Sequence, residues 1–106
     1  MEQTEEIKSY EKWDDIIEKD NILKGVYSFG FENPSQIQKT AIKPIIERRD
    51  VIAQAPSGTG KTGAFTVGSL HHVDTSLKET QVMILAPTHE LVSQIECVVK
   101  GISMSF

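Results

Sequence analysis

The stretch Asp50–Gly63, DVIAQAPSGTGKTG, decides the fold that the sequence predicts. Residues 51–55 have the length and apolar character of a short buried strand, and the turn-forming run 56–60 follows directly. A helix-compatible run then begins at Lys61 and Thr62. A strand, a glycine-rich turn, Lys-Thr and a helix in this order are what a phosphate-binding loop requires.

The chemistry of such a loop comes mainly from its backbone. Gly58 and Gly60 carry no Cβ and can adopt positive φ, so N–H groups can turn toward phosphate oxygens. The helix that follows adds unpaired N–H groups and the positive end of its dipole. Lys61 supplies a positive charge for the β- and γ-phosphates, and the Thr62 hydroxyl is a ligand for Mg²⁺. Ala55 stands where the strict pattern has glycine, and the alternative is a glycine-rich loop that only caps a helix.

A second strand and helix follow the loop. Residues 81–86, QVMILA, form another apolar run of strand length that Pro87 ends, and Thr88 is placed to cap a helix. The apolar stripe of that helix has the clearest helical period in the chain: Leu91, Val92, Ile95, Val98, Val99 and Ile102. Strand, helix and strand in this order imply a right-handed crossover and parallel pairing. The predicted fold class is α/β, with parallel strands, flanking helices and an incomplete sheet, because two strands cannot bury themselves.

Two helices are predicted upstream of the loop. The first starts at Asp20-Asn21, and Gly30 ends it. The second runs from Ser35 to about Glu47 and is kinked or ended early by Pro44. Ser35 and Gln38 match the capping box S-x-x-Q, so Gln38 has a purely structural explanation as well as any functional one. Residues 1–12 are predicted to be a flexible acidic tail, and residues 13–106 the folded part.

Length and charge limit the functional classes. The chain has 106 residues, enough for one small domain, and a net charge of −4. Residues 1–20 hold eight acids and three lysines, so the remainder is close to neutral and has no basic stripe typical of nucleic-acid binding. The lone Cys97 excludes an internal disulfide and fits a reducing compartment. No apolar run is long enough for a membrane span and no signal peptide is present, so we expect a cytoplasmic or nuclear protein.

Three segments together resemble the DEAD-box RNA helicases. Residues 30–38, GFENPSQIQ, are similar to the Q motif, which is specific to this family. Residues 55–62, APSGTGKT, resemble motif I, where alanine in the first position is usual, and residues 87–91, PTHEL, resemble motif Ia. The resemblance covers nearly the whole chain and implies the N-terminal part of the family's first RecA-like P-loop NTPase domain. Within the family, the likeness is to members that act in translation initiation.

The resemblance implies a role for individual residues. Phe31 would pack against adenine, Gln38 would read the adenine edge through its amide, and the carbonyl of Asn33 would accept from the base. The phosphates and magnesium of ATP would be held by Ser57, Gly58, Thr59, Gly60, Lys61, Thr62 and Gly63, with Lys61 and Thr62 as the catalytic members. Pro87 and Thr88 would lie beside the RNA backbone. Trp13 stands where the family has an upstream aromatic residue, and we expect it to belong to the core.

The departures from the family pattern bear on activity. His89 stands where the family has arginine, and a neutral imidazole cannot replace a guanidinium fork at a phosphate. No Asp-Glu-Ala-Asp occurs, so the carboxylates that hold Mg²⁺ and activate water are missing. We therefore expect the ATP-binding portion of an RNA helicase of translation initiation or RNA remodelling, which alone binds ATP weakly or not at all and has no ATPase activity. Whether Phe106 is a true terminus stays open.

Two alternatives come from other functional classes. The chain could be a non-catalytic fragment that binds a translation partner such as a scaffold protein. It could also be an unrelated P-loop kinase or GTPase. Base selectivity separates the last alternative from the helicase interpretation, because a Q motif requires adenine in preference to guanine.

Overall fold

The computed structural model describes residues 10–56, 58 and 60–106. Its helices, in chain order, are α1 (Trp13–Ile16), α2 (Asp20–Phe29), α3 (Gln36–Ile46), α4 (Lys61–Leu70) and α5 (His89–Ile102), followed by the 3₁₀ turn η1 (Ser103–Ser105). Residues 1–9 of the predicted acidic tail lie outside the described residues. None of the helices in the described part is long and apolar enough to cross a membrane.

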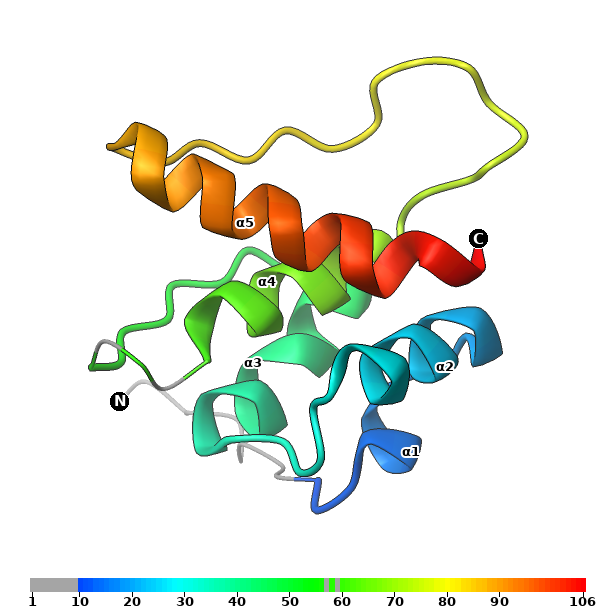
Figure 1. Ribbon diagram of the computed structural model, residues 1–106. Helices are drawn as coiled ribbons and strands as arrows, with labels where there is room; N and C mark the ends of the chain where they lie inside the picture. Colours follow the sequence, from blue (N-terminus) through cyan, green and yellow to red (C-terminus); the bar gives the residue numbers. More distant parts are fainter. Residues whose placement is uncertain (1–9, 57, 59) are drawn as a thin grey trace, which may run out of the picture.

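The three helices α3, α4 and α5 lie side by side as a layer. The α4 helix contacts α3 on one flank and α5 on the other, and α2 packs against α5 and η1 (Figure 1). The short α1 helix contacts α3. This arrangement puts α4, the helix that follows the phosphate-binding loop, at the centre of the layer.

The core lies where α1 and α2 meet this layer. Its largest fully buried side chains are Trp13, Ile16, Ile22, Ile42, Ile102, Val26, Val67 and Thr66. Trp13 is therefore a core residue, as the sequence analysis expected. The stripe of α5 is only partly covered: Ile95 and Ile102 are buried, whereas Val92 is 44% exposed.

Glycine allows α2 and α5 to approach each other closely. A Cβ added at Gly25 would overlap the carbonyl oxygen of Ile102, and one added at Gly101 would overlap the ring of Phe29. Gly68 of α4 lies against Ile45 of α3 in the same way, with 2.6 Å between its ideal Cβ and Cγ2 of Ile45. These glycines weaken the helices that contain them but let the backbones pack at short range.

Most predicted helix ends are confirmed. Gly30 follows α2 in the left-handed conformation with φ 106°, and the Thr88 hydroxyl accepts from the Leu91 N–H at 3.1 Å to cap α5. The α3 helix ends at Ile46, two residues after Pro44. The start of α2 differs from the prediction, because Asp20 is its first helical residue and the capping position is Lys19, which makes no side-chain cap.

The predicted parallel sheet is wrong for the described residues. Residues 51–55 and 81–86 are extended, but neither segment forms a strand, and no backbone hydrogen bond joins the two. The reason is their separation: residues 50–54 line a groove with α3, whereas residues 79–82 and 84 line a cavity with α4 and α5. A single extended segment has no ladder partner, so neither meets the condition for a strand.

The buried histidine directly after α4, His71, is held by two hydrogen bonds. The Glu18 N–H donates to His71 Nε2 at 3.1 Å, so the proton is on Nδ1, which donates to the Val67 carbonyl at 2.8 Å. Burial lowers the pKa of His71 and keeps the ring neutral. The neighbouring Glu18 carboxylate pairs with Lys43 at 2.9 Å, and this hydrogen bond lowers the pKa of Glu18. These contacts make His71 a packing residue.

Candidate nucleotide site

The phosphate-binding loop leads directly into α4. Gly58 and Gly60 have φ of 81° and 93°, which confirms that both glycines adopt the left-handed region. Gly60 is the capping residue of α4 and supplies no side-chain cap. The first hydrogen bond of the helix runs from the Ala64 N–H to the Gly60 carbonyl at 3.0 Å, so the N–H groups of residues 61–63 have no acceptor within the helix. The predicted residues Ser57 and Thr59 lie outside the described residues.

Gln38 joins the Q-motif helix to this loop. Its Oε1 accepts from the Ser35 N–H at 2.8 Å, and its Nε2 donates to the Gly60 carbonyl at 3.1 Å. The side chain is 3% exposed. The predicted capping role of Gln38 is therefore real, and the same amide also contacts a residue 22 positions further along the chain.

Two glycines make room for this amide. A Cβ added at Gly60 would lie 2.5 Å from Gln38 Nε2 and 3.0 Å from Ser35 Oγ. A Cβ added at Gly63 would lie 2.8 Å from the same Nε2 and 3.3 Å from the edge of the Phe31 ring. The structure thus brings together four residues that the sequence analysis assigned to nucleotide binding: Phe31, Gln38, Gly60 and Gly63.

The sequence analysis missed the position of Ser35. Its Oγ belongs to the capping box at the start of α3, is buried, and lies beside the loop glycine. The capping-box pattern placed Ser35 at the helix start, but only the fold could show that its side chain faces Gly60.

An aromatic cluster supports one side of the site. The ring of Phe31 is partly buried, with its centroid 6.0 Å from that of Trp13 and 5.3 Å from that of Phe29. Trp13 is fully buried behind it, whereas Phe29 is 37% exposed. Phe31 is therefore held in place by packing against Trp13 and Phe29 and by the contact of its ring edge with Gly63.

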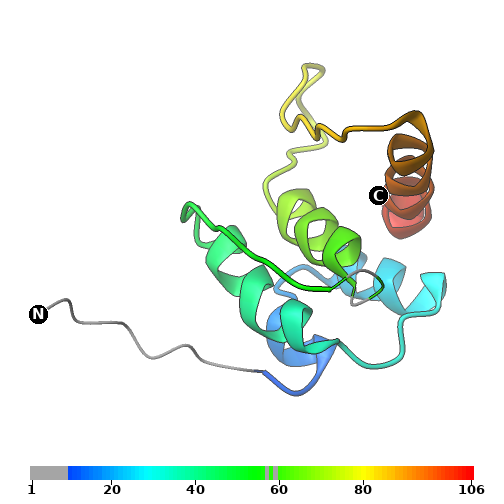
Figure 2. The same cartoon turned by 90° about the vertical axis from the view of Figure 1, so that its left-hand side faces the viewer.

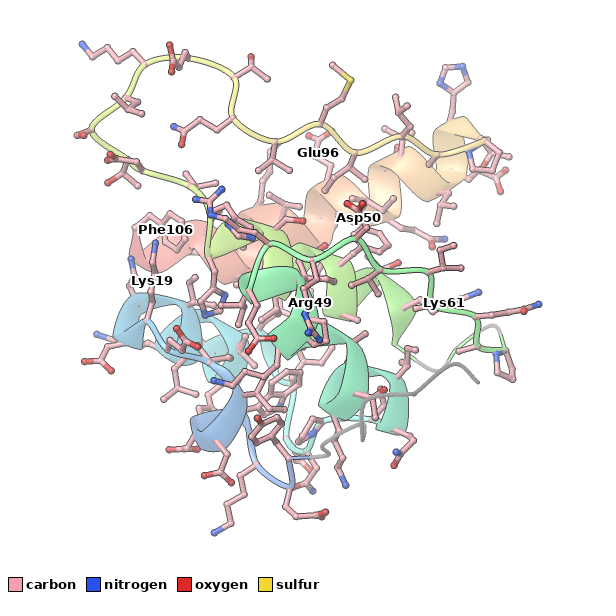
Figure 3. The ribbon with its side chains drawn as sticks, turned by 180° about the vertical axis from the view of Figure 1, so that it is seen from behind. Lys19, Arg49, Asp50, Lys61, Glu96 and Phe106 are labelled. Carbon is pink, nitrogen blue, oxygen red and sulfur yellow. The ribbon has the colours of Figure 1, made fainter. Side chains whose placement is uncertain are left out.

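The charged and hydroxyl groups of the loop lie at the start of α4. Lys61 is exposed and Thr62 is partly exposed, and the side chain of Lys61 points away from the helical layer (Figure 3). The described residues contain no group of three His, Cys, Asp or Glu side chains able to hold a metal ion. The left-handed glycines, the uncapped helix start and Lys61 fit a triphosphate, so a magnesium ion bound here would depend on phosphate oxygens and the Thr62 hydroxyl.

The predicted RNA-binding residues lie at the start of α5. Pro87, Thr88 and His89 are all exposed, and the Thr88 hydroxyl is engaged as the helix cap. Helices α4 and α5 begin at the same end of the molecule, on the left in Figure 1. Both helix N-termini therefore present their positive dipole ends on one side of the fold. Asn33 is exposed at the turn before α3.

Comparisons with known proteins agree on one family. The family model described as DEAD/DEAH box helicase matches residues 35–104. The ATP-dependent RNA helicase eIF4A of Saccharomyces cerevisiae (strain YJM789) is 52% identical over 101 residues, which are 95% of this chain and 26% of that protein. Eukaryotic initiation factor 4A of Drosophila melanogaster is 50% identical over 93 residues, which are 88% of this chain and 23% of that protein.

Solved structures give the same result. The S. cerevisiae Dbp5 structure bound to RNA and ADP BeF3 matches with a TM-score of 0.86 and 34% identity, over 92% of this chain and 25% of that one. A DEAD box protein from the hyperthermophile Methanococcus jannaschii matches with a TM-score of 0.84 and 29% identity, over 91% of this chain and 26% of that one. The chain spans about a quarter of the length of each of these four proteins.

Proposed function

Because the chain belongs to the DEAD/DEAH box helicase family, we propose that it is the ATP-binding portion of an ATP-dependent RNA helicase acting in translation initiation or RNA remodelling. The relatives named as initiation factor 4A support translation initiation, and the proposal extends to a cytoplasmic location and a translation scaffold protein as the partner. The chain spans only about a quarter of those proteins, so RNA unwinding belongs to a longer polypeptide.

The observation that carries the proposal is the pair of hydrogen bonds made by Gln38. One amide connects the start of α3 to the Gly60 carbonyl in the phosphate-binding loop. A primary amide has two N–H donors and two acceptor lone pairs. The bonds to Ser35 and Gly60 use one lone pair and one donor, so one lone pair and one donor are left. The remaining donor and lone pair match N7 and the N6 amino group of adenine. Gln38 would then hold the loop and read the base at the same time.

The other nucleotide contacts follow from the same geometry. Phe31, whose ring edge lies beside Gly63, would pack against adenine, and the Asn33 carbonyl would accept a further base N–H. Backbone N–H groups of Gly58 and of residues 60–63 would bind the phosphates, and Lys61 would add its positive charge. A magnesium ion carried by ATP would have the Thr62 hydroxyl as a protein ligand.

The RNA contact is assigned to the exposed start of α5. Pro87 and Thr88 precede helical N–H groups that favour a phosphate of the RNA backbone. His89 provides no permanent charge there, so RNA binding by this chain is weak. The sequence has no Asp-Glu-Ala-Asp, and we propose that this chain alone binds ATP weakly or not at all and has no ATPase activity.

The test compares two Gln→Glu variants on one helix. Gln38→Glu keeps an acceptor for the Ser35 N–H but loses the donor to Gly60 and places a carboxylate beside the loop. Gln36→Glu makes the same charge change at an exposed position of α3. Titration with fluorescent ATP and GTP analogues should show an adenine preference in the original chain and in Gln36→Glu. Gln38→Glu should lose that preference and bind ATP about tenfold more weakly, as expected when a charged group disrupts a buried hydrogen bond.

Equal affinity for ATP and GTP in the original chain would contradict the proposed function, as would an unchanged preference in Gln38→Glu. A separate assay addresses hydrolysis. Phosphate release in the presence of RNA should stay at background, and turnover that disappears in Lys61→Ala would show that the chain is an active ATPase.

A further inference from the structure

The two adjacent histidines after α4 join three segments at one end of the fold. His71 accepts from the backbone N–H of the residue before Lys19. His72 Nε2 donates to the Ile45 carbonyl, near the end of α3, at 2.7 Å. The Arg48 N–H donates to the same carbonyl at 3.0 Å. These bonds fix two segments that carry a cation, at Lys19 and at Arg48, relative to α4.

A cavity of about 440 Å³ lies between these segments. The charged and aromatic side chains on its wall are Lys19, Arg48, His71, His72, Asp74 and Phe106. Lys19 and Arg48 are exposed, and Phe106 is 41% exposed. The start of α2 and the ends of α4 and α5 lie at this end of the molecule, on the right in Figure 1 and on the far side in Figure 2. The cavity is therefore open to a ligand from solvent.

This cavity lies away from the sites already described. Lys19 and Phe106 are at one edge of the molecule in Figure 3, and Lys61, the first residue of α4, is at the opposite edge. The start of α5, where Thr88 caps the helix, is also distant, because the 14 residues of α5 span about 21 Å. A ligand in the cavity would contact neither the phosphate-binding loop nor Thr88.

Positive charge prevails on the wall of the cavity. Neither Lys19 nor Arg48 forms an ion pair with another described residue. Asp74 is the one acidic residue that lines the cavity, and its Oδ1 accepts from the hydroxyl and the N–H of Ser76 at 2.6 and 3.0 Å. These hydrogen bonds lower the pKa of Asp74, and the nearby Lys19 lowers it further. Two cations and one engaged carboxylate leave a net charge of +1, with the histidines neutral.

The local backbone does not account for an arginine at position 48. Arg48 has φ 66°, where glycine would be less strained. The Ile45 carbonyl already accepts two N–H groups, so the guanidinium is not required to cap the end of α3. The long cationic side chain is therefore available to bind an anion in the cavity.

The combination of cations and an exposed ring indicates the class of ligand. Ammonium and guanidinium groups bind phosphate oxygens. Proteins that bind single-stranded nucleic acids place such cations beside an aromatic side chain on which a base stacks. We propose that the cavity binds a nucleotide of single-stranded RNA, with its phosphate on Lys19 and Arg48 and its base on Phe106. The choice of RNA rests on the proposed function, and the cavity would be a second RNA contact at the other end of the fold.

Two double variants test the phosphate contact. Fluorescence anisotropy measures the binding of fluorescein-labelled decauridylate at low salt and without ATP. Lys19→Gln with Arg48→Gln should weaken binding about fivefold, because two exposed charge pairs are lost. The slope of log K against log salt concentration should fall in magnitude by about 1.4. Lys24→Gln with Lys78→Gln removes the same charge at exposed positions that do not line the cavity, and should leave the affinity within about twofold.

A second pair of variants tests the base contact. Phe106→Ala should weaken decauridylate binding about fivefold or more, because the stacking of one base is lost. Met104→Ala is the control, since Met104 is 84% exposed, lies two residues away in η1 and does not line the cavity. All of these variants replace exposed side chains, and circular dichroism checks that each one folds.

The inference is refuted by equal weakening in the two double variants, by unchanged binding in Phe106→Ala, or by no RNA binding in the original chain. A phosphoserine peptide that binds as tightly as decauridylate, with the same dependence on Lys19 and Arg48, would assign the cavity to a protein ligand and refute it as well. The nucleotide titrations with Gln38→Glu are separate measurements. Loss of adenine selectivity would therefore contradict the proposed function without changing the result at this cavity.

Discussion

Replacing Gly60 with alanine probes the connection between Gln38 and the phosphate-binding loop. Gly60 has φ 93°, so any L-residue is strained there, and the new Cβ would lie 2.5 Å from Gln38 Nε2. The backbone strain costs about 1 kcal/mol or more. Displacing the amide from the Gly60 carbonyl and the Ser35 N–H removes hydrogen bonds worth about 1 kcal/mol each. Gly60→Ala should therefore lower the free energy of unfolding by roughly 2–3 kcal/mol.

Gly58→Ala is the matched control for this variant. Gly58 has a similar φ of 81°, but no described atom lies within 4 Å of its ideal Cβ. It should cost only the backbone strain, about 1 kcal/mol. Urea denaturation followed by circular dichroism measures both values. Equal losses for the two alanine variants would mean that Gln38 does not oppose a side chain at position 60.

A double-mutant cycle then isolates the contact. Gln38→Ala removes the group that the new Cβ would meet, so Gly60→Ala should cost about 1–2 kcal/mol less in that background than in the original chain. Strictly additive losses would refute the reasoning, because additivity is expected only of sites that do not interact.

Three further predictions concern positions outside the loop. Arg48 has φ 66° and is exposed, so Arg48→Gly should raise the free energy of unfolding by about 0.5–1 kcal/mol, and a loss in urea denaturation would contradict this. The lowered pKa of His71 means that only the unfolded chain takes up its proton near pH 6.5, so stability should fall as the pH drops below that value, by at most about 1.4 kcal/mol per pH unit. His71→Asn should flatten this dependence in denaturation curves at pH 7.5 and 5.5, and an equally steep curve would assign the effect to another group. Gly25→Ala should lower the melting temperature through a cost of about 1–3 kcal/mol, because its Cβ would overlap the carbonyl of Ile102; an unchanged melting temperature would show that α2 and α5 separate freely.

Local signals predicted the helices well. The left-handed conformations of Gly30 and Gly60, the Thr88 cap and the end of α3 soon after Pro44 all follow from the chemistry of single residues. The Gln38 amide shows the limit of such reasoning. Its bond to Ser35 is a three-residue pattern visible in the sequence, whereas its bond to Gly60 depends on how α3 packs against α4.

The lack of strand pairing among the described residues could not be predicted from the sequence, for a different reason. Apolar runs 51–55 and 81–86 have the composition of strands, but a strand exists only when a neighbouring backbone pairs with it. Sequence order suggested that consecutive strands pair, and the packing of α4 between α3 and α5 keeps these two apart. The burial of His71 also depends on packing that the sequence does not show. Two adjacent histidines gave no sign that one of them would be buried between Val67 and the backbone of Glu18.

The side-chain amide signals of Gln38 give the most direct test of the central claim, that one amide holds the phosphate-binding loop and reads the base. In ¹⁵N–¹H NMR titrations with Mg-ATP and Mg-GTP, both nucleotides should shift the backbone signals of Gly60 and Lys61 through their shared phosphates. Only ATP should shift the two Nε2 proton signals of Gln38 strongly, because adenine presents an acceptor (N7) beside a donor (N6–H) that match the amide N–H and C=O, whereas guanine opposes the amide oxygen with the acceptor O6. Identical responses of these two signals to ATP and GTP, or no response to either, would contradict the account.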